Sequence, residues 1–361
     1  MPLLANYGGT LQNYALQQVL KSLGCESVTL RLPHEYQGIS SSTFWFRFYP
    51  KAILKFLLKR LQGRKCKKPE LIYAWRRRVS GMERFIQKYI NITDYLPNLS
   101  MQDINRYDID MLLVGSDQVW RPVKYDAEQI YFCGFAKDSN IKRIAYAPSI
   151  ALDEWPFTIE VTQNLRHLIN YFNAISVREE SSVKLIKENL NVDAQWVLDP
   201  TMLLKKKDYL QLCKEKPINV ERFIFAYILD MTDGKRRFID KTAQIKNCKV
   251  LYLTADKVKR GDTIEGWMAN FRDSQYVITD SYHGTVFSLI FNKDFYCFYN
   301  SKRGNARMDS LRKLTGINDR FIDDSNNNDI SEQSIDYSIV DDKIERMRKS
   351  SIDFLKISLS V

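Results

Sequence analysis

Residues 274–299 constrain the fold more than any other stretch of the chain. A short run of aromatic and β-branched side chains at 276–278 predicts a buried strand, and polar residues at 279–281 end it. Residues 285–291 then predict a buried helix, and the apolar residues 294–299 predict a second strand. Because parallel strands need a crossover connection of this kind, the stretch predicts a β-turn-α-β unit.

The turn inside this unit carries the residues best placed for chemistry. In open α/β sheets, ligands bind at the carboxyl ends of strands, where the N-termini of helices face them. Here that position holds Asp280, Ser281, Tyr282, His283 and Gly284. His283 is one of three histidines, and its ordinary pKa near neutrality suits a general acid or base. A histidine that only caps the helix or packs under it is the alternative.

The alternation of strands and helices continues on both sides of the polar, Lys-rich residues 205–217, which read as a hinge. Strands are expected at 27–32, 111–114, 143–147, 174–177, 223–229 and 249–253. Helices are expected at 11–23, 157–171, 181–189, 235–245, 264–271 and 341–354. A length of 361 residues suggests about two domains. The expected fold class is therefore α/β, with two Rossmann-like domains facing across a cleft.

The composition also suggests where the domains begin and end. We expect an N-terminal α/β domain at 1–204, a C-terminal α/β domain at 205–340 and a C-terminal helix at 341–361. Residues 36–99 do not read as sheet and are expected to form a basic helical insertion in the first domain. Residues 321–339, rich in Asp, Asn and Ser, predict a loop.

The excess positive charge belongs to one segment. The chain has a net charge of +11, and the segment from Arg47 to Arg78 holds twelve Lys or Arg and the single acid Glu70, so the remainder is neutral. Residues 51–61 predict an amphipathic helix with Lys on one face and Leu or Ile on the other, and residues 69–89 predict a second helix. This form suits an anionic membrane surface. The alternative is that the apolar face packs on the N-terminal domain.

Other sequence features limit which cellular compartment and which cofactors we expect. Six cysteines are scattered without CxxC spacing, which is typical of reduced thiols in a cytoplasmic protein. We find no run of about 18 apolar residues and no signal-peptide pattern, so we expect neither a membrane span nor a leader. No His, Cys, Asp or Glu cluster has metal-ligand spacing. We therefore expect no metal and no cofactor.

Several motifs resemble those of the polysaccharide pyruvyl transferase family. They are NYGGTLQNYALQQVLKSLG at 6–24, VGSDQVW at 114–120, SVREESS at 176–182, LDPTMLL at 198–204, TDSYHGTVFSLIFNKDF at 279–295 and SKRGNARMDSLRKLTGI at 301–317. They follow the family's order and span nearly the whole chain. The resemblance implies a GT-B architecture and transfer of pyruvate from phosphoenolpyruvate to a sugar as a cyclic ketal, with release of phosphate. Family members usually have a full strand before the first motif. Only five residues precede Asn6 here, so this strand is expected to be short or truncated.

The resemblance and the reaction together suggest roles for individual residues. The donor carries a carboxylate and a phosphate, so it needs cations and helix N-termini, and the proton transfers need an acid and a base. The expected donor-binding residues are Arg178, Ser281, Tyr282, Gly284, Lys302, Arg303 and Arg307. The expected catalytic residues are His283, Asp280 and Asp117, and the expected acceptor-binding residues are Asn6, Tyr7, Gly8, Gly9 and Ser116. Each of these roles has an alternative. Arg178 could form a surface ion pair, and the three cations after residue 299 could lie in a solvated basic loop. Asp117 and Asp280 could be buried helix caps, and the two glycines could form a tight turn.

Two other functions stay open at this point. One is a GT-B glycosyltransferase that uses a nucleotide sugar, and the other is a nucleic-acid-binding protein, suggested by an isoelectric point near 9.2. Against the second, the basic segment has apolar residues on its opposite face and no RNA-binding motif accompanies it, so we expect no nucleic-acid partner. The resemblance places the chain at the inner face of the cytoplasmic membrane of bacteria as a peripheral protein. Its acceptor there would be a sugar linked to polyprenyl diphosphate, a precursor of capsule or exopolysaccharide.

Overall fold

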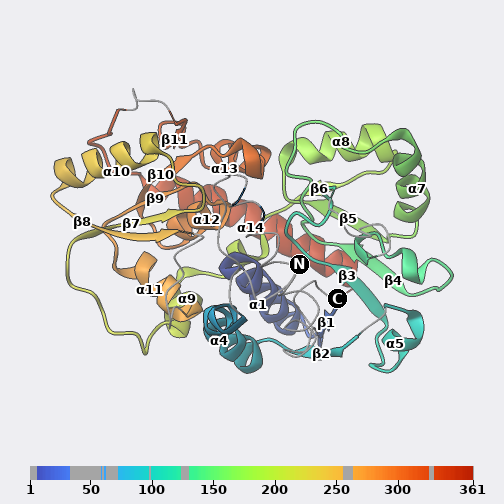
Figure 1. Cartoon of the computed structure of the whole chain (residues 1–361). Helices are drawn as coiled ribbons and strands as arrows, with labels where there is room; N and C mark the ends of the chain where they lie inside the picture. Colours follow the sequence, from blue (N-terminus) through green and yellow to red (C-terminus); the bar gives the residue numbers. More distant parts are fainter. Residues whose placement is uncertain are drawn as a thin grey trace.

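The computed structural model describes residues 6–32, 58, 61, 72–96, 99–122, 130–254, 263–324 and 329–360. Within these ranges the two larger sheets lie in separate lobes of the molecule (Figure 1). Helices α1 (Tyr7–Ser22), α12 (Tyr282–Ile290) and α14 (Tyr337–Leu359) lie between the lobes. The segments that carry the candidate site therefore sit where the two lobes meet.

The first lobe is built on a four-stranded parallel sheet in the order β3-β4-β5-β6. Its strands are β3 (Met111–Val114), β4 (Lys142–Ala145), β5 (Ala174–Val177) and β6 (Gln195–Trp196). Helix α7 (Ile159–Ile169) connects β4 to β5, and α8 (Glu180–Leu190) connects β5 to β6. Short helices α5 (Met101–Asn105), η2 (Gly134–Ala136) and η3 (Pro200–Met202) complete this half. Buried Leu, Ile and Val side chains of the strands pack against α7 and α8.

The second lobe is built on a five-stranded parallel sheet in the order β11-β10-β9-β7-β8. Its strands are β7 (Phe223–Ile228), β8 (Lys249–Thr254), β9 (Tyr276–Thr279), β10 (Asp294–Phe298) and β11 (Phe321–Ile322). Its helices are α10 (Asp233–Lys246), α11 (Ile264–Asp273), α13 (Ala306–Thr315) and the short η4 (Ser301–Arg303), besides α12. The predicted β-turn-α-β unit is confirmed, because β9, α12 and β10 follow one another and the two strands pair in parallel.

The expected fold class is confirmed by this topology. Each lobe is an open parallel sheet with helical crossovers, which is the Rossmann-like arrangement, and the two lobes face each other as in GT-B proteins. Strands predicted from the sequence occur in both sheets with small changes in their bounds. Among the described helices, none is long and apolar enough to cross a bilayer.

Three local predictions are wrong. Residues 205–217, expected to be a polar hinge, contain helix α9 (Lys206–Leu212), because Tyr209 is buried and its ring packs edge-on against Phe287 at 5.0 Å. Within the range 36–99, expected to be helical, β2 (Ile92–Tyr95) forms a parallel pair with β1 (Thr29–Arg31). Residues 321–339, expected to be a loop, begin with strand β11 and end in the first turn of α14.

Two helices tie the lobes together. Tyr7 at the start of α1 stacks on Trp267 of α11, with ring centroids 5.6 Å apart and planes at 11°. At the other end of the chain, the Ser351 hydroxyl of α14 accepts a hydrogen bond from the Leu198 amide at 2.9 Å, and Phe354 packs against Tyr146. One apolar cluster consequently includes side chains from both lobes.

The basic segment lies mostly outside the described residues. Its second predicted helix is confirmed as α4 (Ile72–Tyr89). Of the first predicted helix only Leu58 and Leu61 are described, and both are helical. Leu58 is 50% exposed and Leu61 is 85% exposed.

Candidate active site

The site lies where the carboxyl ends of both sheets meet. Arg178 follows β5, Ser116 and Asp117 follow β3, and His283 lies in the first turn of α12 after β9. Strands β3, β5 and β9 are parallel strands, so the polar residues that follow their carboxyl ends converge on one region. The structure thus brings together most of the predicted site residues although they come from distant parts of the sequence, from Gly8 to Arg307.

Arg178 is the centre of a buried network in the first lobe. It is 2% exposed, and its Nη1 donates to Oδ2 of Asp199 at 2.9 Å while its Nε donates to Oε1 of Glu179 at 3.3 Å. Nη1 also lies 3.4 Å from the Ser116 hydroxyl. Burial opposes its charged form, but the nearby Tyr282 ring and the two carboxylates keep its pKa above the ordinary value. Arg178 is therefore a fixed cation and not a member of a surface ion pair.

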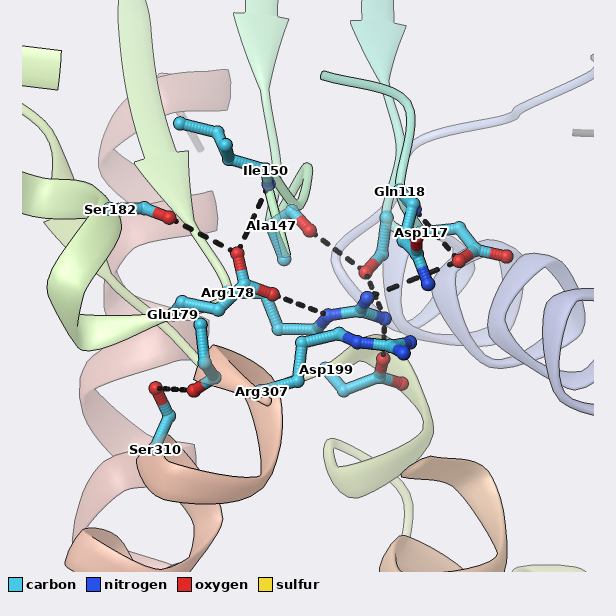
Figure 2. Close-up of polar contacts among 12 residues, drawn as sticks. Asp117, Gln118, Ala147, Ile150, Arg178, Glu179, Ser182, Asp199, Arg307 and Ser310 are labelled. Atoms are coloured by element: carbon cyan, nitrogen blue, oxygen red, sulfur yellow. Dashed lines mark hydrogen bonds and ion pairs between the residues drawn. The ribbon is translucent and has the colours of Figure 1, made fainter. Parts of the chain in front are cut away.

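Arg307 of α13 reaches the same place from the second lobe. Figure 2 shows the two guanidinium groups side by side, both directed toward Asp199. Their central carbons lie 4.4 Å (Arg178) and 5.4 Å (Arg307) from the centre of the Tyr282 ring. Arg307 is 6% exposed and donates from Nη2 to the Arg303 carbonyl at 2.6 Å. Burial and the neighbouring Arg178 lower its pKa to about 10, so the two cations repel each other.

Several buried polar atoms at this point have no hydrogen-bond partner among the described residues. They are Nη2 of Arg178, Nε of Arg307, Nε2 of His283, Oδ2 of Asp117 and Oε1 of Gln12. Buried donors without partners cost about 1–3 kcal/mol each, so a native protein seldom keeps several together unless a ligand satisfies them. Two unpartnered guanidinium donors beside each other are suited to an anion with several oxygens.

His283 is buried and lies against the start of α1. A Cβ on Gly8 would approach the His283 ring to 2.1 Å, so only glycine leaves room for the ring there. Its Nε2 lies 3.8 Å from Oδ2 of Asp199. Burial lowers the pKa of His283 to about 4, while Asp199 and Asp117 partly oppose the shift. The free protein therefore holds a neutral imidazole at pH 7, whereas the sequence suggested a group that titrates near neutrality.

Asp199 is the carboxylate that holds the site together, and sequence reasoning missed it. Its Oδ2 accepts from Gln12 Nε2 and Arg178 Nη1, and its Oδ1 accepts from the amide and hydroxyl of Thr201 at 3.0 and 2.7 Å. Burial alone would raise the pKa of Asp199, but His283, Arg178 and Thr201 together lower it. The signal was present in the sequence, since Asp199 and Pro200 follow a predicted strand in one of the resembling motifs.

Asp117 sits on a strained backbone beside the arginines. Its φ of 100° is unusual for a residue with a side chain, and Ala147 on the neighbouring strand end has a φ of 55°. Oδ1 of Asp117 accepts from the Gln118 amide at 2.7 Å and lies 4.0 Å from Nη2 of Arg178. Strain of this kind persists where the surrounding structure fixes it and often marks functional sites. Its catalytic role stays a prediction.

Asp280 belongs to a different network from the one predicted. Both of its oxygens are occupied by donors: Lys235 Nζ at 2.7 Å, the amides of Leu229 and Asp230, and Asn300 Nδ2. It therefore clamps the ends of β7, β9 and β10, and the carboxylate beside His283 is Asp199. The described structure shows no contact between Asp280 and His283, and the Asp280 oxygens have other donors, so a catalytic role of Asp280 stays a prediction that this geometry does not support.

The other predicted donor-binding residues divide into groups. Tyr282 packs under both arginines, whereas Ser281 caps α12 by accepting from the Gly284 amide at 3.3 Å. A Cβ on Gly284 would meet the Thr279 hydroxyl at 2.2 Å, so this glycine serves close packing. Lys302 is exposed, and Arg303 pairs with Asp230 at 2.6 Å. Of the three cations after β10, Arg307 is the one that the structure places at the site.

Four of the five predicted acceptor-binding residues, Asn6 to Gly9, lie at the start of α1, and the fifth, Ser116, follows β3. Tyr7 is buried in its stack with Trp267, and Ser116 donates to the Ala147 carbonyl at 2.8 Å. Gly8 lies against His283, while a Cβ on Gly9 would contact Asn6 at 3.3 Å and Asp117 at 3.5 Å. These contacts give Tyr7, Gly8 and Gly9 packing roles at the start of α1 and Ser116 a hydrogen bond after β3, and acceptor binding by the predicted residues stays a prediction. Among the described residues, no group of three or more metal-ligating side chains occurs.

The fold and this site define a two-lobed α/β protein with a paired-arginine anion site where the lobes meet. The model of the polysaccharide pyruvyl transferase family matches residues 6–302, so the chain belongs to that family of transferases. No curated protein sequence matches the chain. Among solved structures, it is similar to a UDP-GlcNAc 2-epimerase from Methanocaldococcus jannaschii, crystallised with UDP-GlcNAc and UDP. The identity is 10%, the match covers 97% of this chain and 96% of that one, and the TM-score is 0.46.

Proposed function

We propose that the protein transfers pyruvate from phosphoenolpyruvate to a sugar of a polysaccharide precursor, forming a cyclic ketal and releasing phosphate. The observation that carries the proposal is the pair of buried guanidinium groups, Arg178 and Arg307, whose unpartnered N–H donors lie together. Phosphoenolpyruvate has a carboxylate and a phosphate on one small molecule, and each is a bidentate partner for arginine. The helices that begin at Glu180 and Tyr282 add positive ends nearby.

The reaction needs two proton transfers. The enol methylene gains a proton to become the methyl group, a sugar hydroxyl adds to the central carbon, and a second hydroxyl displaces the phosphate. His283 is neutral in the free protein, so it can accept a proton from a hydroxyl. The bound donor, with its anionic carboxylate and phosphate, would raise the pKa of His283, because a nearby negative charge favours the imidazolium, and this would let His283 protonate the methylene or the leaving phosphate. Asp199 holds the positive charge that forms there.

Donor binding tests the proposal and separates it from a glycosyltransferase reaction. Phosphoenolpyruvate should raise the melting temperature of the protein, and UDP- and GDP-sugars should not. Phosphate release from phosphoenolpyruvate should then depend on an added acceptor, measured with a panel of galactose-, mannose- and glucose-terminated glycans. Stabilisation by a nucleotide sugar alone, with no phosphate release, would assign the site to a glycosyltransferase instead.

The acceptor is proposed to be carried on a polyprenyl diphosphate at the inner face of the cytoplasmic membrane. Supporting this, Leu58 and Leu61 are exposed, and the segment from Arg47 to Arg78 carries the whole excess of positive charge. Each Lys or Arg near an anionic bilayer contributes about 1 kcal/mol. The protein should co-sediment with vesicles containing phosphatidylglycerol at low salt and be released at high salt.

A charge-reversal variant controls for loss of fold. Lys55→Glu, Lys59→Glu and Arg60→Glu together should abolish vesicle binding while phosphate release on a short soluble acceptor continues. No vesicle binding by the wild type at low salt would remove the membrane from the proposal. Loss of activity on the soluble acceptor in this variant would give the segment a role in the fold instead.

A further inference from the structure

A polar pocket opens between the lobes on the outer side of the arginine pair. It has a volume of about 300 Å³, which is at the lower end of the range for small-molecule sites. Asp153, Glu180 and Ser181 line it from the first lobe, and Asp309, Ser310 and Lys313 of α13 line it from the second. A pocket built from both lobes exists only when they are together.

We propose that this pocket binds the sugar that accepts the pyruvyl group, an inference that rests on the proposed function. Eight of its nine lining residues carry a hydroxyl, carboxylate, amide or cationic group, and their aliphatic carbons and Ala306 add apolar wall between these groups. A lining of this kind is suited to a neutral ligand with many hydroxyl groups, because hydroxyls both donate to carboxylates and accept from cations and amides.

Two carboxylates in the pocket have acceptor capacity to spare. Glu180 uses Oε1 to accept from Lys313 Nζ at 2.6 Å, and Asp309 uses Oδ1 to accept from Tyr299 Oη at 2.8 Å and Arg312 Nη2 at 3.1 Å. In the part of the chain that the structure describes, Oε2 of Glu180 and Oδ2 of Asp309 take part in no hydrogen bond. These two oxygens can therefore accept from hydroxyl groups of a ligand.

The pocket and the arginine pair are built on neighbouring residues of the same elements, although neither arginine lines the pocket. Glu180 follows Glu179, whose Oε1 accepts from Arg178, and Ala306 precedes Arg307. The Glu180 amide donates to the Ser310 hydroxyl at 3.0 Å, so the start of α8 and the first turns of α13 are joined directly. Figure 2 shows Ser310 on the same helix as Arg307, one turn further along. A sugar in the pocket would thus be bound by the same two segments, the start of α8 and the first turns of α13, that adjoin the arginines.

Other ligand classes fit the pocket less well. An anion would face the three carboxylates of Asp153, Glu180 and Asp309, while the two cations of the lining, Arg312 and Lys313, are already paired with Asp309 and Glu180. Burial and the nearby Asp309 raise the pKa of Asp153, which indicates that the pocket already has an excess of negative charge. A divalent cation is not favoured either, because these carboxylates do not form a metal-binding group among the described residues.

Direct binding of simple glycosides tests the inference without relying on turnover. Saturation-transfer NMR would measure how tightly the methyl glycosides of galactose, mannose and glucose bind to the wild-type protein, with and without phosphoenolpyruvate. At least one glycoside should bind to the wild type, and Asp309→Asn and Lys313→Met should each weaken that binding about tenfold, as expected for loss of one or two hydrogen bonds. Asp193→Asn is the matched control, because Asp193 is 91% exposed and lies outside the pocket.

The outcomes separate this inference from the proposed function. Weakened glycoside binding in both pocket variants, with a wild-type-like rise in melting temperature on adding phosphoenolpyruvate, would support the acceptor pocket. Binding of none of the three glycosides, or binding that both variants leave unchanged, would overturn it even if phosphoenolpyruvate binds. Absence of any effect of phosphoenolpyruvate on the wild type would instead overturn the proposed donor, whatever the glycosides do.

Discussion

Removing Arg307 should make the free protein more stable while it destroys donor binding. Folding lowers the pKa of Arg307 from 12.5 to about 10, chiefly through burial and then through the neighbouring Arg178. At pH 7 the charged form is thus disfavoured in the folded protein by about 3 kcal/mol, since one pKa unit corresponds to about 1.4 kcal/mol. Replacement by Met keeps much of the volume that packs on Tyr282 and removes the charge.

The hydrogen bond that Arg307 makes offsets part of this gain. Its Nη2 donates to the Arg303 carbonyl, and the loss of that bond costs about 1 kcal/mol. Gln118 Nε2 still lies 3.4 Å from the same carbonyl, so the oxygen is not left buried without a donor. Arg307→Met should therefore stabilise the free protein by about 2 kcal/mol. For a chain of this size that corresponds to a rise in melting temperature of about 2–3 °C.

Differential scanning fluorimetry with and without phosphoenolpyruvate checks both halves of the prediction. Arg307→Met should melt higher than the wild type when free and should show no further rise with phosphoenolpyruvate. Arg346→Met is the matched control, because Arg346 is an exposed partner of Asp342, and it should change neither value. A lower melting temperature for the free Arg307→Met protein, or a full response to phosphoenolpyruvate, would refute the reasoning.

Three further predictions concern catalysis and pH. His283→Ala and Arg178→Ala should each reduce phosphate release at least about 100-fold while circular dichroism stays unchanged, and near-full activity would remove that residue from the mechanism. Activity should survive EDTA, and loss that Mg²⁺ restores would contradict this. Folding lowers the pKa of His283 from 6.5 to about 4, so protonation favours the unfolded chain. The free energy of unfolding should consequently fall by about 3 kcal/mol as the pH drops from 6.5 to 4. In urea-unfolding experiments across this pH range, His283→Gln should remove that fall. An equal fall in the variant would contradict a neutral His283 in the folded protein.

The sequence predicted the sheets well because their strands are short, apolar and bounded by polar turns. The unit β9-α12-β10 was found from that pattern alone, and its parallel pairing followed from the crossover. The elements that were missed are those whose apolar side chains are sparse or whose partners are distant. Helix α9 looked like a polar connection because its lysines dominate the composition, yet Tyr209 and Leu212 anchor it in the core.

The sequence predicted several residues that the structure brings together, but it missed Asp199 and predicted none of the pairings. Arg178 and His283 could be chosen because each follows a strand, and both lie at the site. The sequence does not show the distances that decide which carboxylate forms a hydrogen bond or an ion pair with which side chain. Asp280 and Asp199 each follow a strand as well, and only the structure shows that Lys235 and Asn300 occupy Asp280 while Asp199 lies beside His283 and Arg178.

The arginine pair also explains why the two lobes would act as one enzyme. Arg178 is neutralised within its own lobe by Asp199 and Glu179, but Arg307 has only a carbonyl to which it donates in the described structure. A bound anion would supply the missing negative charge and at the same time bridge the lobes. The ion pair between Lys313 and Glu180, at 2.6 Å, and the close approach of Gly304 to the Ala151 carbonyl lie on the same seam. Donor binding would then hold the two lobes together where the polar pocket lies between them. The free energy of donor binding would thus help to form the pocket for the acceptor sugar.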